Sequence, residues 1–207
     1  MVSNNFWYVQ HGQSHDAPDS FKRMRNEGLS LDVIMFICTL KACGSMGAID
    51  KGNQIHDEVV KRKLLEKNIV LDTALVHMFA RCGMLEKARK VLKELHIRDV
   101  IAWSALIAGC AQQGQGHEAQ KCLNHMESEG ISLDNITLLC VLSACAHSRL
   151  LNNAKMLFEI VTTKYCISPN LQHLNCMVVV FACGNQYDKS ISVVKAIPFF
   201  EYSAIWI

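Results

Sequence analysis

Apolar residues recur in the middle of the chain at the spacing of an amphipathic helix. In residues 102–112, AWSALIAGCAQ, four of them fall three, four and seven positions apart, on one helical face: Trp103, Leu106, Ile107 and Cys110. Residues 117–127, HEAQKCLNHME, show the same spacing at Ala119, Cys122, Leu123 and Met126. Gly114 separates the two stretches, and glycine readily adopts the left-handed backbone that ends a helix. The pattern predicts a helix, a tight turn and a second helix.

The same break recurs along the chain. Equivalent positions are Gly12, Gly47, Gly83, Gly114, Arg149 and Asn185, so the successive spacings are 35, 36, 31, 35 and 36 residues. Asparagine is the next best residue after glycine for a left-handed turn, whereas arginine suits it less well. Self-similarity at a period of 20 to 50 residues indicates an array of supersecondary units.

Three other offsets repeat in register with these breaks. Small residues stand five positions after each break: Ala17, Gly52, Ala88, Ala119, Ala154 and Ser190. Apolar residues stand twelve positions after: Met24, Val59, Leu95, Met126, Val161 and Ile197. Aromatic or cysteine residues stand four positions before: Tyr8, Cys43, Phe79, Cys110, Cys145 and Phe181. We therefore expect an all-α fold of eleven to thirteen helices, in antiparallel pairs that stack into a solenoid.

Composition narrows the class of protein. Half of the 207 residues are apolar, but none of the apolar runs is long enough for a membrane span, so no membrane partner is expected. The net charge of +2 is unlike that of a nonspecific nucleic-acid binder, yet it allows a protein that reads bases through a few residues. Ten cysteines lie within apolar helical stretches, which indicates reduced thiols. The first residues resemble neither a secretory signal nor a transit peptide.

Two constellations resemble metal sites and fail on closer reading. His56-Asp57-Glu58 has the H-x-E pattern of zinc deaminases, but the C-x-x-C that should follow is missing. The pairs Cys38/Cys43 and Cys140/Cys145 recur because they share one repeat register, and free cysteine packs as a small apolar residue. We expect no metal site, no cofactor and no catalysis from this sequence.

Units of 31, 35 and 36 residues in rotation resemble the pentatricopeptide repeat family, in its plant class that alternates P, L and S motifs. VIAWSALIAGCAQQGQGHEAQKCLNHMESEGISLD is similar to a P motif, and IVLDTALVHMFARCGMLEKARKVLKELHIRD to an S motif. The resemblance implies these boundaries: a partial P-like repeat at 1–32, an L-like repeat at 33–68, an S-like repeat at 69–99, a P-like repeat at 100–134, late L-like and S-like repeats at 135–170 and 171–202, and the start of an E-type motif at 203–207. It also implies a right-handed superhelix, and a chain that is a fragment of a longer protein.

The resemblance to this family implies that the chain binds single-stranded organelle RNA, one base per repeat. The fifth residue of the first helix and the last residue of the repeat meet the base edge, and the second residue packs against the base. In the S-like repeat these are Thr73, Asp99 and Val70, and in the P-like repeat they are Ser104, Asp134 and Ile101. A hydroxyl with an aspartate favours guanine in this family. Without the family, Thr73 and Asp99 would be taken for residues that cap helix ends.

The other repeats depart from this pattern. The L-like repeats have Ile37 and Leu139 at the fifth position, where an apolar side chain forms no hydrogen bond to a base. The late S-like repeat has Asn175 at the fifth position, but Tyr202 ends it where the family usually has aspartate. Asn175 is therefore a candidate RNA-binding residue with an unusual partner.

Three functions remain open at this point. The first is an RNA-binding part of an organelle RNA processing or editing factor, from a mitochondrion or chloroplast, with possible protein partners in an editing complex. The second is a helical scaffold that binds proteins, which would need no polar pair in register. The third is a degenerate fragment without activity, favoured by Arg149 at a turn and Tyr202 at a reading position.

Overall fold

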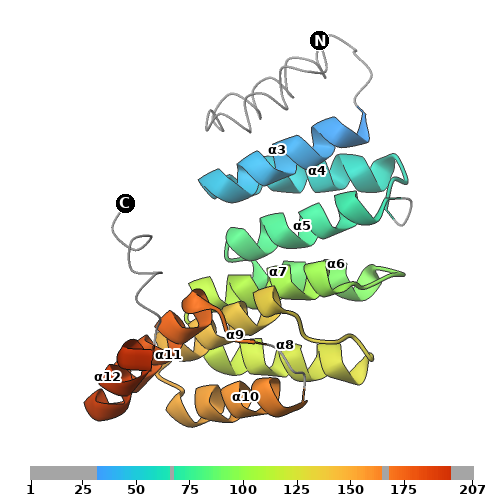
Figure 1. Cartoon of the computed structure of the whole chain (residues 1–207). Helices are drawn as coiled ribbons and strands as arrows, with labels where there is room; N and C mark the ends of the chain where they lie inside the picture. Colours follow the sequence, from blue (N-terminus) through green and yellow to red (C-terminus); the bar gives the residue numbers. More distant parts are fainter. Residues whose placement is uncertain (1–31, 66–67, 165–167, 197–207) are drawn as a thin grey trace. The chain divides into compact units, whose positions relative to one another are not determined.

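The computed structural model describes residues 32–65, 68–164 and 168–196, and this part of the chain is helical (Figure 1). The described helices form five hairpins, so a first helix and a second helix of each hairpin alternate along the chain. The first helices are α3 (Val33–Met46), α5 (Ile69–Arg81), α7 (Val100–Gln112), α9 (Asn135–His147) and α11 (Leu171–Cys183). The second helices are α4 (Ile49–Lys61), α6 (Leu85–Glu94), α8 (Gly116–Ser128), α10 (Leu151–Lys164) and α12 (Tyr187–Ala196). No strand occurs among the described residues, which confirms the all-α prediction.

An acidic or amide side chain stands immediately before each first helix and caps it. The Oδ1 atoms of Asp32, Asn68, Asp99, Asp134 and Asn170 accept hydrogen bonds from backbone N–H groups three residues further on, at 2.7–3.1 Å. Such caps satisfy one of the donors that a helix leaves unpaired at its start. The first helices therefore begin at residues 33, 69, 100, 135 and 171, where the expected repeats begin. Their assignment to P, L and S classes stays a prediction.

The turns within the helix pairs occur where the sequence predicts them. Five residues there have left-handed backbone, with φ between 55° and 76°: Gly47, Gly83, Gly114, Arg149 and Asn185. The next N–H donates to the carbonyl of the residue four positions before the turn, as from Met84 to Phe79 over 2.9 Å. This hydrogen bond is typical of a Schellman motif at the end of a helix. It explains why the turn residue and the core residue four positions before it repeat together in the sequence. The sixth expected turn, at Gly12, lies outside the described residues.

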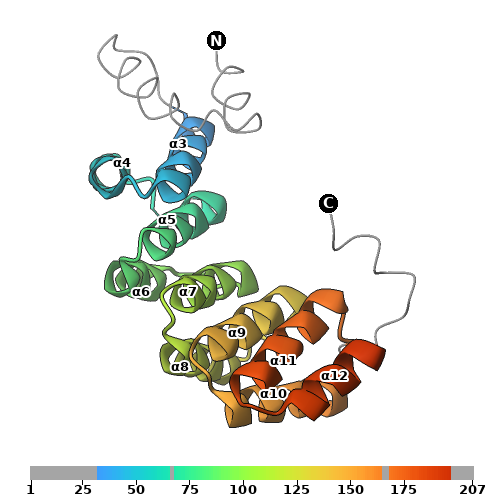
Figure 2. The same cartoon turned by 90° about the vertical axis from the view of Figure 1, so that its left-hand side faces the viewer.

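The described chain forms two compact units, one ending at Gly109 and the other beginning at Cys110, within α7. In the first unit, α3 packs against α5, while α4 and α6 pack against them from the second layer (Figure 2). In the second unit, α9 packs against α11, and α10 and α12 pack against these two helices (Figure 2). Each unit therefore has one layer of first helices and one of second helices.

The repeating positions form the core of these layers. The residues four positions before each turn are buried: Cys43, Phe79, Cys110, Cys145 and Phe181. The small residues five positions after are buried too: Gly52, Ala88, Ala119, Ala154 and Ser190. Twelve positions after, Val59, Leu95 and Met126 are buried, whereas the Val161 side chain, Met24 and Ile197 lie outside the described part.

Two of the small residues show what the absence of a large side chain permits. The Ser190 hydroxyl donates to the carbonyl oxygen of Val178 over 3.0 Å, and so joins α12 to its own first helix. A β-carbon on Gly52 would lie 2.5 Å from Sδ of Met78, so α4 also approaches the first helix of the following pair. Among the described residues, none of the helices is both long and apolar enough to cross a bilayer.

Candidate nucleic-acid interface

The second residue of four first helices is apolar, β-branched and exposed. Ile34, Val70, Ile101 and Ile136 are 56%, 60%, 63% and 64% exposed, on helices whose other large apolar residues are mostly buried. On α11 the equivalent residue is the exposed polar Gln172. Exposed apolar side chains that repeat at one register indicate a contact surface, because scattered ones would show no period.

The fifth residues differ in how far solvent can reach them. Thr73 on α5 is half-buried, whereas Ser104 on α7 retains only 8% exposure. Ile37 and Leu139 are half-buried, and Asn175 on α11 is exposed. The structure thus places Thr73 and Ser104 at the same position of successive first helices in the first unit, with unequal access. Sequence reasoning could not predict this difference, because exposure depends on neighbouring helices.

The last residues of the repeats act as helix caps. Oδ1 of Asp99 accepts from the N–H of Ala102 over 2.8 Å. Oδ1 of Asp134, in the second unit, accepts from both the N–H and the hydroxyl of Thr137 over 2.7 Å. Capping is therefore confirmed for Asp99. It is wrong for Thr73, because Asn68 caps α5. A carboxylate has two acceptor oxygens, so capping through Oδ1 is compatible with a ligand contact through Oδ2.

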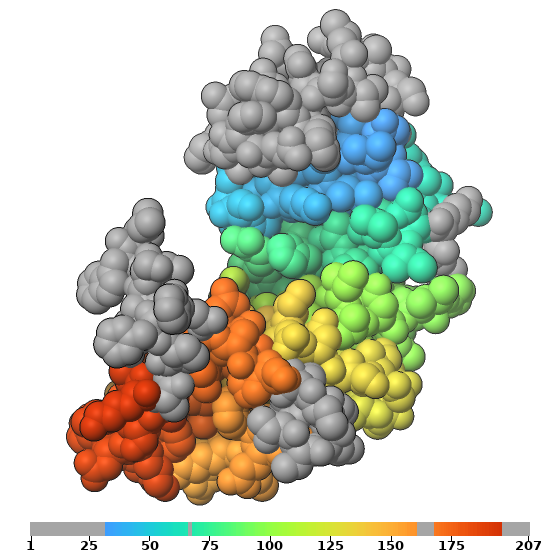
Figure 3. Space-filling model, in the orientation of Figure 1, coloured from blue at the N-terminus to red at the C-terminus, as the bar shows by residue number. Residues whose placement is uncertain are grey.

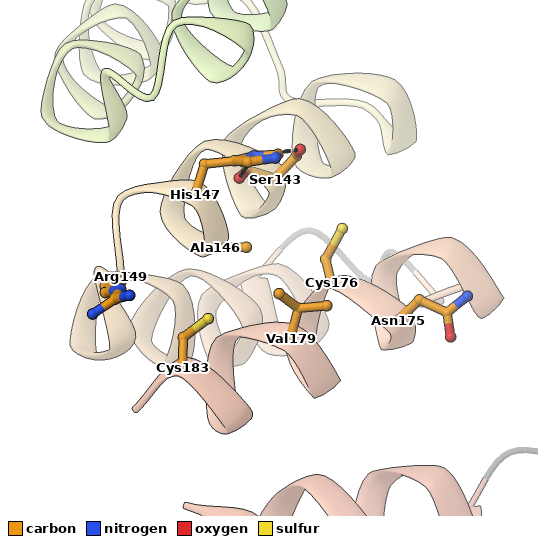
Figure 4. A pocket seen from close by; sticks show the side chains of 8 residues that line it. All are labelled: Ser143, Ala146, His147, Arg149, Asn175, Cys176, Val179 and Cys183. Carbon is orange, nitrogen blue, oxygen red and sulfur yellow. Dashed lines mark hydrogen bonds between the residues drawn. The ribbon is translucent and has the colours of Figure 1, made fainter. Parts of the chain in front are cut away.

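A groove of about 450 Å³ lies between α9 and α11 in the second unit (Figure 4). Its walls include Ser143 and His147 from α9, Arg149 from the following turn, and Asn175, Val179 and Cys183 from α11. These three α11 residues stand at the fifth, ninth and thirteenth positions, which share one helical face, and Cys176 at the sixth position also lines the groove. The predicted residue Asn175 therefore belongs to a hollow in the layer of first helices.

His173 connects the starts of α9 and α11, and sequence reasoning missed it. Its ring is fully buried. Nδ1 accepts from the N–H of Asn170 over 3.0 Å, so Nε2 carries the proton and donates to the carbonyl oxygen of Asn135 over 2.8 Å. A capping box normally has glutamate or glutamine at this position. The available signal was a side-chain acceptor three positions after Asn170, the last residue of the expected late L-like repeat, but the carbonyl that Nε2 contacts is 38 residues away in sequence.

Cys43, Cys145 and His56 occupy packing positions. Burial raises the pKa of the Cys43, Cys140 and Cys145 thiols to about 11 in each case, so these groups stay protonated near neutral pH. The His56 ring meets Phe79 edge-on, with 5.5 Å between ring centroids. Within the described ranges, no group of three or more histidine, cysteine or acidic side chains is arranged to hold a metal ion.

The helical hairpins and their register define a helical-repeat protein, and comparison with known proteins identifies the repeat. A model described as the PPR repeat family matches residues 98–147, and the PPR repeat matches residues 7–29 and 73–100. A putative pentatricopeptide repeat-containing protein of Arabidopsis thaliana is 34% identical over 96% of this chain, and a second is 30% identical over 96%. The chain belongs to the pentatricopeptide repeat family. It spans 40% and 29% of the lengths of these two relatives.

Solved structures with the same fold include a pentatricopeptide repeat protein and an RNase P. The pentatricopeptide repeat protein PPR10 from maize matches 86% of this chain with a TM-score of 0.67 and 19% identity, over 26% of its own length. PPR10 in complex with an 18-nt psaJ RNA element matches with a TM-score of 0.71 and 20% identity, over the same shares of the two chains. Nuclear proteinaceous RNase P 2 from A. thaliana matches 89% of this chain and 43% of its own, with a TM-score of 0.65 and 18% identity. The fold is an all-α helical-repeat solenoid.

Proposed function

We propose that this chain binds single-stranded RNA along its first helices. The observation that carries the proposal is the exposed β-branched residue at the second position of four first helices, namely Ile34, Val70, Ile101 and Ile136. Apolar side chains suit the faces of nucleobases, which are apolar whatever the base, so such contacts add affinity without selecting one base. The PPR10 structure in complex with RNA supports the proposal, since its fold matches most of this chain.

Sequence discrimination comes from the pair Thr73 and Asp99, and more weakly from Ser104 with Asp134. The half-buried Thr73 hydroxyl can donate to a purine acceptor, and the Asp99 carboxylate can accept from the N–H groups of guanine. Each correct pairing contributes ~1–3 kcal/mol, by analogy with base contacts in DNA. Ser104 contributes less because it is nearly buried.

The remaining repeats contact the RNA but discriminate little between bases. Ile37 and Leu139 form no hydrogen bond with a base edge, so the L-like repeats act as spacers. Asn175 is exposed in the α9/α11 groove and is available to a base. Its expected partner Tyr202 lies outside the described residues.

The parent protein acts in organelle RNA processing or editing, with RNA and the proteins of an editing complex as partners. Support comes from the relatives, which are plant proteins, one of them called mitochondrial in its name. In this setting the chain supplies recognition and another part of the complex supplies the chemistry.

Binding of paired oligonucleotides tests the proposal. An RNA with two neighbouring guanines should bind more tightly than the matched RNA with two cytosines. Replacing Thr73 and Ser104 together by asparagine should shift preference toward pyrimidines, with Thr73→Asn giving the larger share. If neither RNA binds above background, even when well-behaved repeats flank the chain, the scaffold or inactive-fragment interpretation is preferred.

The Asp99→Asn substitution distinguishes base recognition by Asp99 from its role as a helix cap. Asparagine caps α5 and α11 in this same chain, through Asn68 and Asn170, so helix stability should be retained. The amide replaces a pure acceptor by a donor and an acceptor, which matches the edge of adenine better than that of guanine. Asp99→Ala serves as the control that loses both the cap and the reading group. An unchanged base preference in Asp99→Asn would show that Asp99 is only a cap.

A further inference from the structure

Charge is distributed very unevenly between the two layers of helices. The five first helices contain only three aspartate, glutamate, lysine or arginine residues: Lys41, Asp72 and Arg81. Asp72 is 5% exposed, whereas Lys41 and Arg81 are exposed. The charged side chains that the layer of first helices exposes are therefore cations, and both belong to the first unit.

A close approach of two helices brings these cations together. A β-carbon on Gly44 of α3 would lie 3.3 Å from Cα of Met78, and 3.7 Å from both Cβ and Cδ of Arg81. The Arg81 side chain of α5 thus lies against α3 at Gly44, and Lys41 stands three residues before Gly44 on the same helical face. The surfaces of α3 and α5 adjoin in the space-filling view (Figure 3).

Neither cation forms an ion pair with an acid among the residues that the structure describes. Within the described residues, Lys41 and Arg81 take part in none of the ion pairs, whereas Arg62 and Lys121 lie 2.7 Å from Glu58 and Glu118. A favourable contact with the end of the helix dipole accounts for Arg81, the last residue of α5. It does not account for Lys41, which lies in the middle of α3.

The pKa of the half-buried His77 responds to the positive charges of Lys41 and Arg81. Its pKa is lowered from the ordinary value of 6.5, chiefly by burial and further by the positive charges of Arg81 and Lys41. His77 stands one turn before Arg81 on α5 and is therefore exposed to cations from both helices. The surface is short of negative charge.

We propose that Lys41 and Arg81, with His77 beside them, bind the phosphodiester backbone of the RNA. The proposal rests on the proposed function and gives the L-like repeat 33–68 a role. Ile37 cannot read a base there, and the repeat instead holds the strand through its phosphates while Thr73 reads in the next repeat. Phosphate contacts set the register of a strand and carry no sequence information themselves. Arginine and lysine are the side chains that suit this contact.

Salt dependence of RNA binding by the 207-residue chain tests the proposal. The logarithm of the association constant falls with the logarithm of salt concentration by about 0.7 per phosphate contact in a single strand. Lys41→Gln combined with Arg81→Gln should therefore reduce the slope by about 1.4 and weaken binding of guanine-containing and cytosine-containing strands by the same factor. Circular dichroism should show unchanged helix content.

Lys90→Gln combined with Lys93→Gln is the matched control. Both lysines are exposed on α6 in the second layer of the same unit, and the change in net charge is identical. This control should leave the slope nearly unchanged. Equal reductions in the two double variants would overturn the proposal, because they would reflect net charge alone.

Neutral methylphosphonate linkages, introduced one at a time into the RNA, locate the contact. One or two linkages should weaken binding to the wild-type chain but have no effect on the Lys41→Gln, Arg81→Gln variant. If these linkages also weaken binding to that variant, Lys41 and Arg81 are not the phosphate contacts, although the proposal that the chain binds RNA still stands. A wild-type chain that ignores RNA but binds an acidic peptide through these two residues would overturn the proposed function as well.

Discussion

Nε2 of His173 on α11 donates a hydrogen bond to the carbonyl oxygen of Asn135, the first residue of α9, over 2.8 Å. The ring is fully buried, and its other nitrogen accepts from the N–H of Asn170. One side chain therefore joins the starts of two first helices in the second unit, which is where the proposed RNA contacts begin on each helix.

His173→Leu should lower the free energy of unfolding by ~1–3 kcal/mol, because it leaves the Asn135 carbonyl and the Asn170 N–H without this partner. Urea denaturation measures the loss. His117→Leu, at an exposed position of α8, is the control and should change stability by less than about 0.5 kcal/mol. Equal effects of the two substitutions would mean that the bridge contributes nothing.

Ala119→Leu should destabilise the chain by ~1–3 kcal/mol, because Ala119 is fully buried in α8 and the larger side chain overpacks its surroundings. A thermal melt or denaturant titration gives the difference. Lys121→Leu adds an apolar side chain at an exposed position of the same helix and should be nearly neutral. An unchanged melting curve for Ala119→Leu would count against the repeat register.

Arg149→Gly should stabilise the chain by about 0.5–1 kcal/mol. Arg149 has φ of 55°, a left-handed conformation that costs a side chain such as arginine ~1–2 kcal/mol, part of which glycine loses again through the entropy of the unfolded chain. Asn185→Gly, at φ of 56°, should gain less because asparagine tolerates this backbone. Urea denaturation midpoints are measured for Arg149→Gly and Asn185→Gly. A larger gain in stability for Arg149→Gly shows that backbone strain at Arg149 is the cause.

Arg81→Gln should raise the pKa of His77, because it removes one of the two positive charges that lower it. An NMR titration of the His77 ring follows the change directly. Lys93→Gln, whose charge is not among those acting on His77, should leave the pKa in place. A pKa that does not move in Arg81→Gln would show that burial alone determines it.

The free energy of unfolding should decrease as pH falls below about 6.5, in part through His56. Burial lowers its pKa in the folded state, Lys87 and Lys90 lower it further, and Asp57 and Glu94 oppose the shift. The unfolded chain therefore binds this proton more readily, and stability is lost as pH falls through the ordinary histidine pKa. His56→Phe retains a ring beside Phe79 without the titration. Its stability should depend less on pH over this range than that of the wild type.

The sequence by itself determined the helical hairpins. A cap is decided by a side chain and an N–H three residues away, as in Asp99 and Ala102. A turn is decided by one left-handed residue and the carbonyl four positions before it, as in Gly83 and Phe79. These interactions are local, so their register repeats in the sequence and can be read from it. The same register placed Val70 and Ile101 at equivalent positions of successive first helices.

Only the tertiary structure decided which of these positions are accessible and what lies across from them. Ser104 and Thr73 share a register, yet neighbouring packing leaves Ser104 nearly buried. His173 reaches a carbonyl 38 residues away, and Arg81 lies against Gly44 only because α3 and α5 approach closely there. Such contacts depend on how successive hairpins dock, and docking is set by the sum of many side-chain contacts between residues that are distant in sequence.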